Sequence, residues 1–196
     1  SSVLPQSEYE ALLNEFVARY PSNADGYLRR AGYYAAQGAE NPAQFDKATA
    51  DMEQALRVSN KKDDVHYNIA RLIYNYQLSK PKETYRDWTY DRALKEITAA
   101  QAIDSLPVYI QLEGDILFAA QQYAAASQAY LRVTRTALAS PASFYSAAKA
   151  KELAGADIKE VVALMDSCVN RCVKPFTAET APYLLERARV YMDAEM

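Results

Sequence analysis

One spacing of residues recurs along this chain and constrains its fold more than any other feature. A large residue is followed four positions later by a small one, and three positions after that by an aromatic or aliphatic one. The five small residues are Ala31, Ala70, Gly114, Ala148 and Ala188, and only the fourth copy departs, with Lys151 at the apolar position. Steps of three and four residues share one face of an α-helix, and a small residue there lets a second helix approach closely. The spacing therefore predicts a series of similar, closely packed helices.

A second spacing follows each of the first four copies. It starts at Phe45, Tyr90, Tyr123 and Ile158, with smaller or apolar residues three, seven and ten positions later. The two spacings together resemble the tetratricopeptide repeat, a helix–turn–helix unit of about 34 residues. The resemblance covers residues 24–195. It implies an all-α fold, a right-handed α-α superhelix (solenoid) of antiparallel helix pairs.

The repeats divide the chain into a cap and an array. Residues 1–22 are expected to form an N-terminal cap, whose helix covers 7–20 with Ser7 as its N-cap. The array covers 23–196, with repeats at 23–60, 61–105, 106–140 and 141–174 and a half-repeat at 178–196. Asp63 and Asp64 are expected in the first turn of a helix, where acidic side chains are favourable.

The last predicted helix has no helix after it to pack against. Its Leu184, Ala188 and Tyr191 form an apolar face at the end of the chain. Terminal repeats need a polar outer face, because an unpaired repeat exposes its core. We therefore expect that the natural chain extends beyond Met196 or that this helix pairs with another chain, as in a homo-oligomer.

Composition excludes several classes of function. The 22 Lys and Arg nearly balance the 25 Asp and Glu, so no nucleic-acid partner is expected. No apolar run approaches the roughly 18 residues of a membrane-spanning helix. The five glycines are too dispersed for a phosphate-binding loop. The start of the sequence lacks the regions of a signal peptide, and a periplasmic or bacterial cell-envelope location is as consistent with the composition as a cytoplasmic one.

The sequence offers little for metal binding or catalysis. Cys168 and Cys172 lie four residues apart, so one is expected in the core and the other half-exposed. With His66 they make too few ligands for a zinc site, and we predict no metal and no cofactor. His66 occupies a packing position of the repeat, and no Ser or Cys nucleophile has a neighbouring His. We therefore expect that the protein is not an enzyme.

In tetratricopeptide arrays the first helix of each pair lines a concave groove that binds a peptide or protein segment. Carried over to this chain, the resemblance implies the groove residues Leu28, Tyr67, Asn68, Arg71, Tyr74, Asn75, Gln111, Asp115, Phe118, Tyr145, Lys149, Glu152, Leu185 and Arg189. Tyr67, Arg71 and Tyr74 form the strongest cluster, since Tyr and Arg are enriched in recognition surfaces. The alternative is that these tyrosines fill gaps between helices. The family's carboxylate clamp for chaperone tails is matched only at Asn68, so we do not expect that partner.

The long turn 79–89 is a second candidate binding site. It carries Lys80 and Lys82, and then Tyr85, Arg86 and Trp88. An exposed Trp beside cations would be a good anchor for a partner. The alternative is that Trp88 folds back and covers the end of the second repeat.

Three functions remain open from the sequence. The first, which we favour, is a scaffold that binds a protein or peptide in the groove. The second is a structural or assembly module that docks through the last helix or the turn 79–89. The third is an enzyme or carrier that uses the groove as a pocket, in which paired carboxylates, for example Asp115 with Glu152, could meet.

Overall fold

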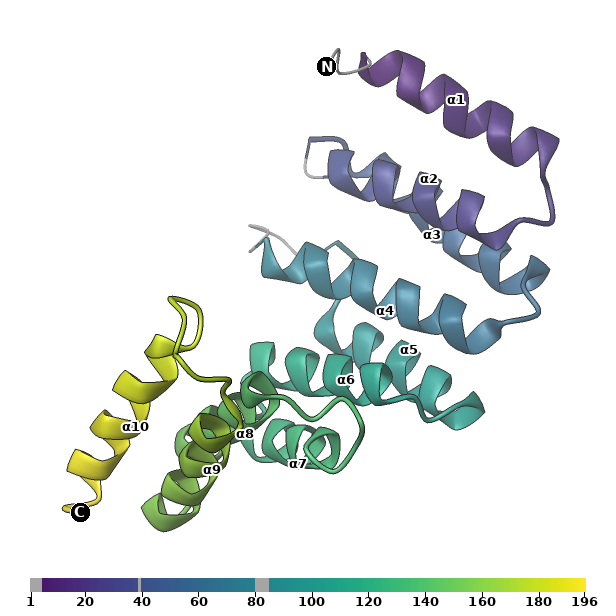
Figure 1. The fold of residues 1–196 in the computed structure, drawn as a ribbon. Helices are drawn as coiled ribbons and strands as arrows, with labels where there is room; N and C mark the ends of the chain where they lie inside the picture. Colours follow the sequence, from purple (N-terminus) through teal and green to yellow (C-terminus); the bar gives the residue numbers. More distant parts are fainter. Residues whose placement is uncertain (1–4, 39, 80–84) are drawn as a thin grey trace. The chain divides into compact units, whose positions relative to one another are not determined.

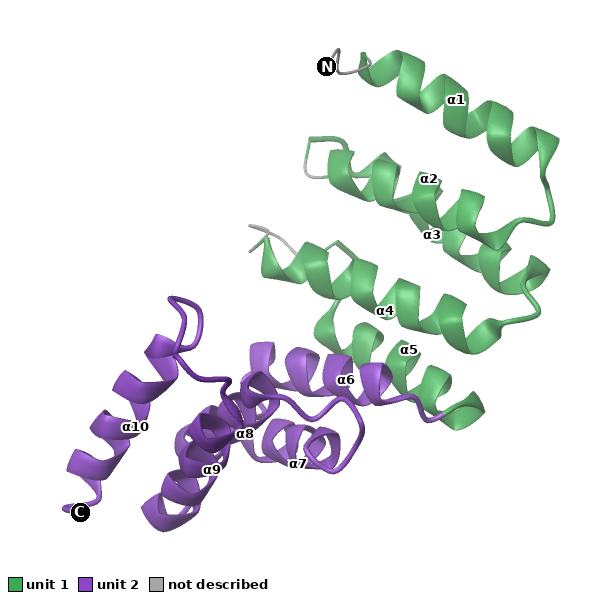
Figure 2. Ribbon diagram, viewed as in Figure 1, with its two compact units in different colours: residues 1–104 green, residues 105–196 purple. Residues whose placement is uncertain are grey.

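The computed structural model describes residues 5–38, 40–79 and 85–196, and all regular structure in these ranges is α-helical. This part of the chain contains ten helices, which are labelled in Figure 1, and this confirms the predicted all-α class. The helices divide between two compact units, residues 1–104 and 105–196 (Figure 2). The division falls beside the boundary between the predicted repeats 61–105 and 106–140.

The first unit contains five helices that pack in the order of the sequence. They are α1 (Gln6–Arg19), α2 (Ala24–Gln37), α3 (Ala43–Val58), α4 (Lys62–Leu78) and α5 (Tyr90–Ile103). The strongest contacts join α2 to α3 and α4 to α5, and α1 packs on α2. Contacts of α4 with α2 and α3 link the two pairs. The helix pairs are antiparallel, as the two sequence spacings predict.

The second unit continues with helices of similar length. They are α6 (Pro107–Ala119), α7 (Tyr123–Val133), α8 (Pro141–Leu153), α9 (Ile158–Arg171) and α10 (Ala181–Asp193). Here α6 packs on α7, α7 on α8, α8 on α9 and α9 on α10. Val161, Met165 and Val190 are buried in the core that α8, α9 and α10 share.

Local sequence signals set several of the helix ends. The side chains of Asn23, Thr89 and Asp157 cap α2, α5 and α9 by accepting hydrogen bonds from backbone N–H groups of the first turn. Gly155 follows the end of α8 with a φ of 74°, which a residue without a Cβ adopts at low cost. The predicted cap at Ser7 is wrong: α1 begins at Gln6, and no side chain caps it.

The small residues of the repeat spacing allow close helix packing, as predicted, in the first four copies. Ala31, Ala70 and Ala148 are fully buried. A Cβ at Gly114 would lie only 2.7 Å from Cε1 of Tyr130 on α7, so glycine is needed for that approach. Ala188 is the exception, because it is exposed on the outer face of α10.

Two glycines inside helices give a matched test of this packing. We expect Gly114→Ala to destabilise the protein by about 1–2 kcal/mol, because the new methyl group overpacks against the buried Tyr130 ring. Gly32→Ala should stabilise it by about 0.5–1 kcal/mol, since a Cβ there meets only Cδ1 of Leu72 at 3.9 Å and alanine favours the helix. Urea unfolding followed by far-ultraviolet circular dichroism measures both changes. If both substitutions change the free energy of unfolding in the same direction, the proposed difference in packing between the two sites is wrong.

None of the helices in the described ranges combines the length and the apolar character required to cross a membrane.

Candidate functional site

A groove runs between α2 and α4, the first helices of the first two pairs. The two helices contact one another within the first unit, and both are labelled in Figure 1. Between them lies a cavity of about 470 Å³. Its lining residues are Asp25, Leu28, Arg29, Gly32, Asn68, Arg71, Leu72 and Asn75. On each helix they follow steps of three and four, so each set shares one helical face. We refer to this cavity as the α2/α4 groove.

Arg71 is held in place by its own helix. Its Nη2 donates a hydrogen bond to Oδ1 of Asn68 at 2.9 Å, and its guanidinium carbon lies 5.7 Å from the centroid of the Tyr67 ring. Asn68 in turn donates from Nδ2 to the backbone carbonyl oxygen of Asp64 at 2.8 Å. Three of the predicted groove residues therefore lie together, with Tyr67 and Asn68 positioning Arg71. Tyr74 is half-buried on the same helix and does not line the groove.

The groove carries cationic side chains that are available to a ligand. Arg29 and Arg71 are exposed, and no acidic side chain in the described part of the chain forms an ion pair with either. The side-chain amide of Asn75 is also exposed and makes no hydrogen bond to a described residue. Asp25 is the acidic residue of the lining, so two guanidinium groups face one carboxylate.

The groove becomes apolar toward the C-terminal ends of α2 and α4. A second cavity of about 550 Å³ adjoins the first there and shares Gly32, Leu72 and Asn75 with it. The remaining lining residues are Ala35, Ala36, Tyr76 and Ser79. A bound segment would therefore meet cations and amides at one end and small apolar side chains at the other.

Arg29 was not among the residues predicted from the sequence, although the repeat spacing contained the signal. Ala31 and Ala70 occupy the same position of successive repeats, 39 residues apart, and the same shift takes Arg29 to Asn68. Asn68 was predicted as a groove residue and its equivalent was not. The structure places both beside the same cavity.

In the second unit most of the predicted groove residues are engaged in contacts with other side chains of the same unit. Nε2 of Gln111 and the hydroxyl of Tyr130 both donate to Oδ1 of Asp115, at 2.9 and 2.8 Å. Burial raises the pKa of Asp115, although these two hydrogen bonds oppose the rise. Phe118 packs against the rings of Tyr123 and Tyr130, with centroids 5.3 and 6.4 Å apart. These contacts favour the alternative in which such side chains fill space between helices.

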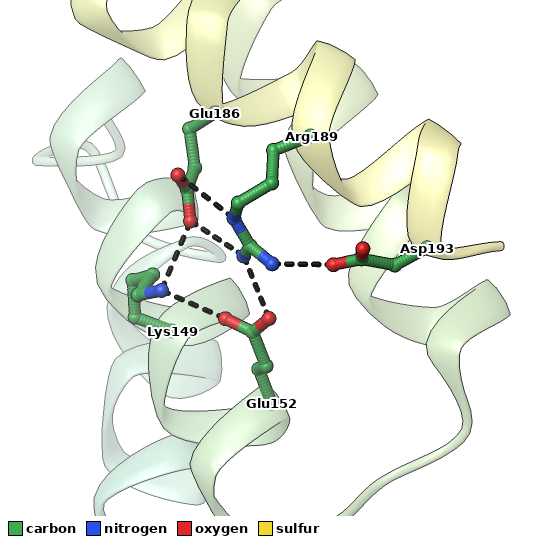
Figure 3. Close-up of polar contacts among 5 residues, drawn as sticks. All are labelled: Lys149, Glu152, Glu186, Arg189 and Asp193. Carbon is green, nitrogen blue, oxygen red and sulfur yellow. Dashed lines mark hydrogen bonds and ion pairs between the residues drawn. The ribbon is translucent and has the colours of Figure 1, made fainter.

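Lys149 and Arg189, two further predicted groove residues, belong to a cluster of five charged side chains (Figure 3). Lys149 Nζ lies 2.7 Å from Glu152 and 2.9 Å from Glu186. Arg189 Nη2 lies 2.6 Å from Glu152 and 2.7 Å from Glu186, and its Nη1 lies 2.5 Å from Asp193. The cluster ties α10 to α8, so both cations have a structural role.

The remaining unit-two candidates do not meet at one site. Tyr145 packs against Tyr183, with ring centroids 5.2 Å apart. Leu185 is exposed on the outer side of α10. Asp115 and Glu152 take separate hydrogen-bond partners, Tyr130 for the first and Lys149 and Arg189 for the second.

The charged cluster makes the stability of the second unit dependent on pH. Hydrogen bonds from Arg189 and then Lys149 lower the pKa of Glu186 to about 2, against about 4.3 in the unfolded chain. A lowered carboxyl pKa stabilises the fold above pH ~4.3, and this contribution is lost as the pH falls toward ~2. We expect a loss of about 1 kcal/mol, reduced by solvent because the Arg189 side chain is 40% exposed.

Unfolding by urea across this pH range measures the effect. The variant Glu186→Gln should lose correspondingly less stability on acidification than the wild type. If the free energy of unfolding falls equally in the two proteins on acidification, the ionised Glu186 side chain does not stabilise the packing of α10.

In the described part of the turn 79–89, Trp88 is buried and Arg86 is exposed. Trp88 is 1% exposed, which confirms the alternative that it folds back and not the one in which it is an accessible anchor. The Tyr85 ring stacks on Phe45 with centroids 4.9 Å apart, and Arg86 pairs with Asp46 at 2.7 Å. Lys80 and Lys82 lie outside the described residues.

Both cysteines are buried, which corrects the expectation of one half-exposed thiol. The Cys172 thiol donates to the backbone carbonyl oxygen of Cys168 at 3.4 Å. Burial raises the pKa of Cys168 to about 12, so its thiol stays protonated at neutral pH. In the part of the chain that the structure describes, no three His, Cys, Asp or Glu side chains converge as a metal site would require.

The fold and the groove together define the class of the protein as an all-α chain of repeated helix pairs. No protein-family model matches the sequence, and the curated proteins contain no significant match to it.

Proposed function

We propose that this chain is a tetratricopeptide-like scaffold that binds a peptide or protein segment in the α2/α4 groove. The observation that carries the proposal is the composition of that groove. Arg29 and Arg71, which form no ion pair with a described residue, lie beside the apolar side chains of Leu28 and Leu72 in one cavity. Guanidinium groups next to apolar surface are typical of protein recognition sites.

The repeat pattern supports the assignment to this kind of scaffold. The two sequence spacings coincide with the helix pairs α2/α3, α4/α5, α6/α7 and α8/α9. The groove is lined by the first helix of each of two pairs, and tetratricopeptide arrays bind their ligands on the face that these helices form. The right-handed superhelix is part of the same proposal.

A role without chemistry of its own is proposed on the same grounds. His66, the single histidine, lies with Nδ1 2.7 Å from Oε2 of Glu96, and Oε1 of Glu96 accepts from Arg92 Nε at 2.8 Å. This arrangement joins α4 to α5. It supports a structural role for His66, because its partner is already engaged by a cation.

Selection of random peptides displayed on phage tests the proposal. The wild type is compared with Arg71→Ala/Asn75→Ala, which removes two exposed groove side chains, and with Glu53→Ala/Arg57→Ala on the exposed face of α3. Peptides should be enriched by the wild type and by the α3 variant and lost with the groove variant. Enrichment that ignores the groove substitutions would overturn the proposal.

A second candidate function is assembly through α10. Leu185 and Met192 are 75% and 78% exposed, and with Ala188 they form an apolar stripe on the outer face of this helix. The predicted face of Leu184, Ala188 and Tyr191 is corrected in part, because Tyr191 packs on the core and donates to Asp166 Oδ1 at 2.6 Å. The stripe supports self-association of two copies.

Light scattering after size-exclusion chromatography tests this second candidate. The wild type should be dimeric at high concentration, and Leu185→Gln/Met192→Gln should be monomeric. A monomeric wild type would eliminate pairing between copies through α10.

A further inference from the structure

A separate pocket lies between α1 and α2, and none of the predicted site residues belongs to it. Its volume is about 420 Å³. The lining residues are Tyr9, Leu12, Leu13, Phe16, Asn23, Asp25, Gly26 and Arg29. We refer to it as the α1/α2 pocket. Its aromatic and aliphatic residues come from α1, whereas Asn23, Asp25 and Arg29 come from the N-cap and the first two turns of α2.

The walls of the α1/α2 pocket are held by contacts within the first unit. A Cβ at Gly26 would lie 2.7 Å from Cδ1 of Phe16, so the absence of a side chain there lets the Phe16 ring lie against α2. Phe16 also packs on Tyr20, with ring centroids 5.0 Å apart. Tyr9 contacts the ring of Tyr33 at 5.6 Å. Tyr9, Leu12 and Phe16 nevertheless stay partly exposed, which leaves apolar surface for a ligand.

The α1/α2 pocket and the α2/α4 groove share one wall. Asp25 and Arg29, which are both exposed on α2, line both cavities. A ligand group that binds Arg29 is therefore within reach of apolar surface on α1 and of Arg71 on α4. This continuity makes the two cavities parts of one recognition surface.

The charges on this surface decide what kind of segment it fits. Arg29 and Arg71 are exposed and unpaired within the described residues, whereas Asp25 lies in the first turn of α2, where it also stabilises the helix. An anionic ligand group would therefore gain charge-assisted hydrogen bonds that a cationic one would lack. The neighbouring aromatic pocket adds burial of an apolar side chain.

We propose that the α1/α2 pocket and the α2/α4 groove together bind a peptide segment in which a carboxylate stands beside an aromatic or large aliphatic side chain. The carboxylate pairs with Arg29 and Arg71, and the apolar side chain enters the pocket of Leu12 and Phe16. This inference rests on the proposed peptide-binding function and specifies its ligand. The carboxylate is that of an Asp or Glu side chain within the segment, because the groove continues past Arg29 and Arg71 into a second cavity.

Peptide display on the full chain tests the ligand class first. The enriched peptides should contain Asp or Glu next to Phe, Tyr, Trp, Leu or Met. Enrichment of basic or purely polar peptides that depend on the groove would overturn this inference and leave the proposed function standing. Failure to enrich any peptide would overturn both.

Fluorescence polarisation with an enriched peptide then tests the residues. Arg29→Gln should weaken binding about tenfold, because a charge-assisted hydrogen bond is lost. Asp25→Asn, on the same wall, should tighten binding, because it removes a carboxylate that repels the anionic group of the peptide. Weaker binding by Asp25→Asn with tighter binding by Arg29→Gln would show that the surface selects a cation.

The apolar pocket has its own matched pair of variants. Leu12 and Leu153 are 51% and 50% exposed, so substitution by Gln should leave the folding of both intact. Leu12→Gln should weaken peptide binding about three- to tenfold, and Leu153→Gln on α8 should not change it. Equal affinity of the two variants would remove the α1/α2 pocket from the site. Peptides with a free and with an amidated C-terminus should bind equally well, and loss of binding on amidation would overturn the assignment of the carboxylate to a side chain.

Discussion

Replacing Trp88 by alanine is expected to destabilise the first unit by about 3–5 kcal/mol, the cost of removing a large, fully buried aromatic side chain. The Trp88 ring lies 5.0 Å from the centroid of Phe45 and 5.6 Å from that of Tyr76. Its Nε1–H donates to Oγ1 of Thr49 at 3.1 Å, which joins the segment before α5 to α3. A cavity at this position would remove contacts with α3 and α4 together.

Urea unfolding followed by far-ultraviolet circular dichroism measures this loss, since Trp88 is the sole tryptophan and its fluorescence disappears with it. Thr49→Val is the companion variant. It keeps the ring packing but leaves the buried indole N–H without its acceptor, so we expect a smaller cost of about 1–3 kcal/mol. If Trp88→Ala unfolds at the same urea concentration as the wild type, the indole is not part of the core.

Asp51→Ala is expected to cost about 3 kcal/mol. The Asp51 carboxylate on α3 accepts from Nε and Nη2 of Arg30 on α2, at 2.8 and 2.7 Å, and both side chains are largely buried. Removing the carboxylate would leave the Arg30 guanidinium between helices without its counter-charge. Its remaining contacts, a hydrogen bond to Asn14 at 2.9 Å and the Tyr27 and Tyr34 rings, replace only part of that interaction.

A paired replacement separates the interaction from the cost of an unpaired charge. Arg30→Met with Asp51→Leu should recover most of the lost stability, because apolar residues of similar size often replace a buried ion pair without loss. Glu160→Gln, which breaks an ion pair of an exposed carboxylate with Lys151, should cost less than about 1 kcal/mol. If the paired replacement is as unstable as Asp51→Ala, the loss of stability comes from altered packing and not from an unpaired charge.

The helices and their pairing could be predicted because they depend on spacings within short stretches of sequence. The small residues at 31, 70, 114 and 148 mark the centre of closely packed helices, and the caps at Asn23, Thr89 and Asp157 act on the next turn of the chain. These interactions are local, so a repeated pattern shows them directly. Ala188 has the same spacing but is exposed, because α10 packs on the core through Val190 and Tyr191 on another face.

The side chains of the candidate site were harder to predict, because their partners lie far away in the sequence. Lys149 and Arg189 have the composition of a recognition surface, but Glu186 and Glu152 engage them across α8 and α10. The ion pairs of Lys149 with Glu152 and of Glu186 with Arg189 follow i, i+3 spacings within one helix, so these two pairs can be predicted from the sequence. The contacts between the two helices cannot. Trp88 depended on Phe45 and Thr49 of α3, which no local spacing connects to it.

The tether on Arg71 has a consequence for the entropy of binding. A free arginine on a surface samples many rotamers, and ordering such a side chain at an interface costs about 0.5–1.5 kcal/mol. The hydrogen bond to Asn68 and the Tyr67 ring restrict Arg71 before any ligand arrives. Arg71, which lines the groove, has therefore lost much of its rotamer freedom before binding. The entropy cost of ordering this side chain on binding is correspondingly smaller.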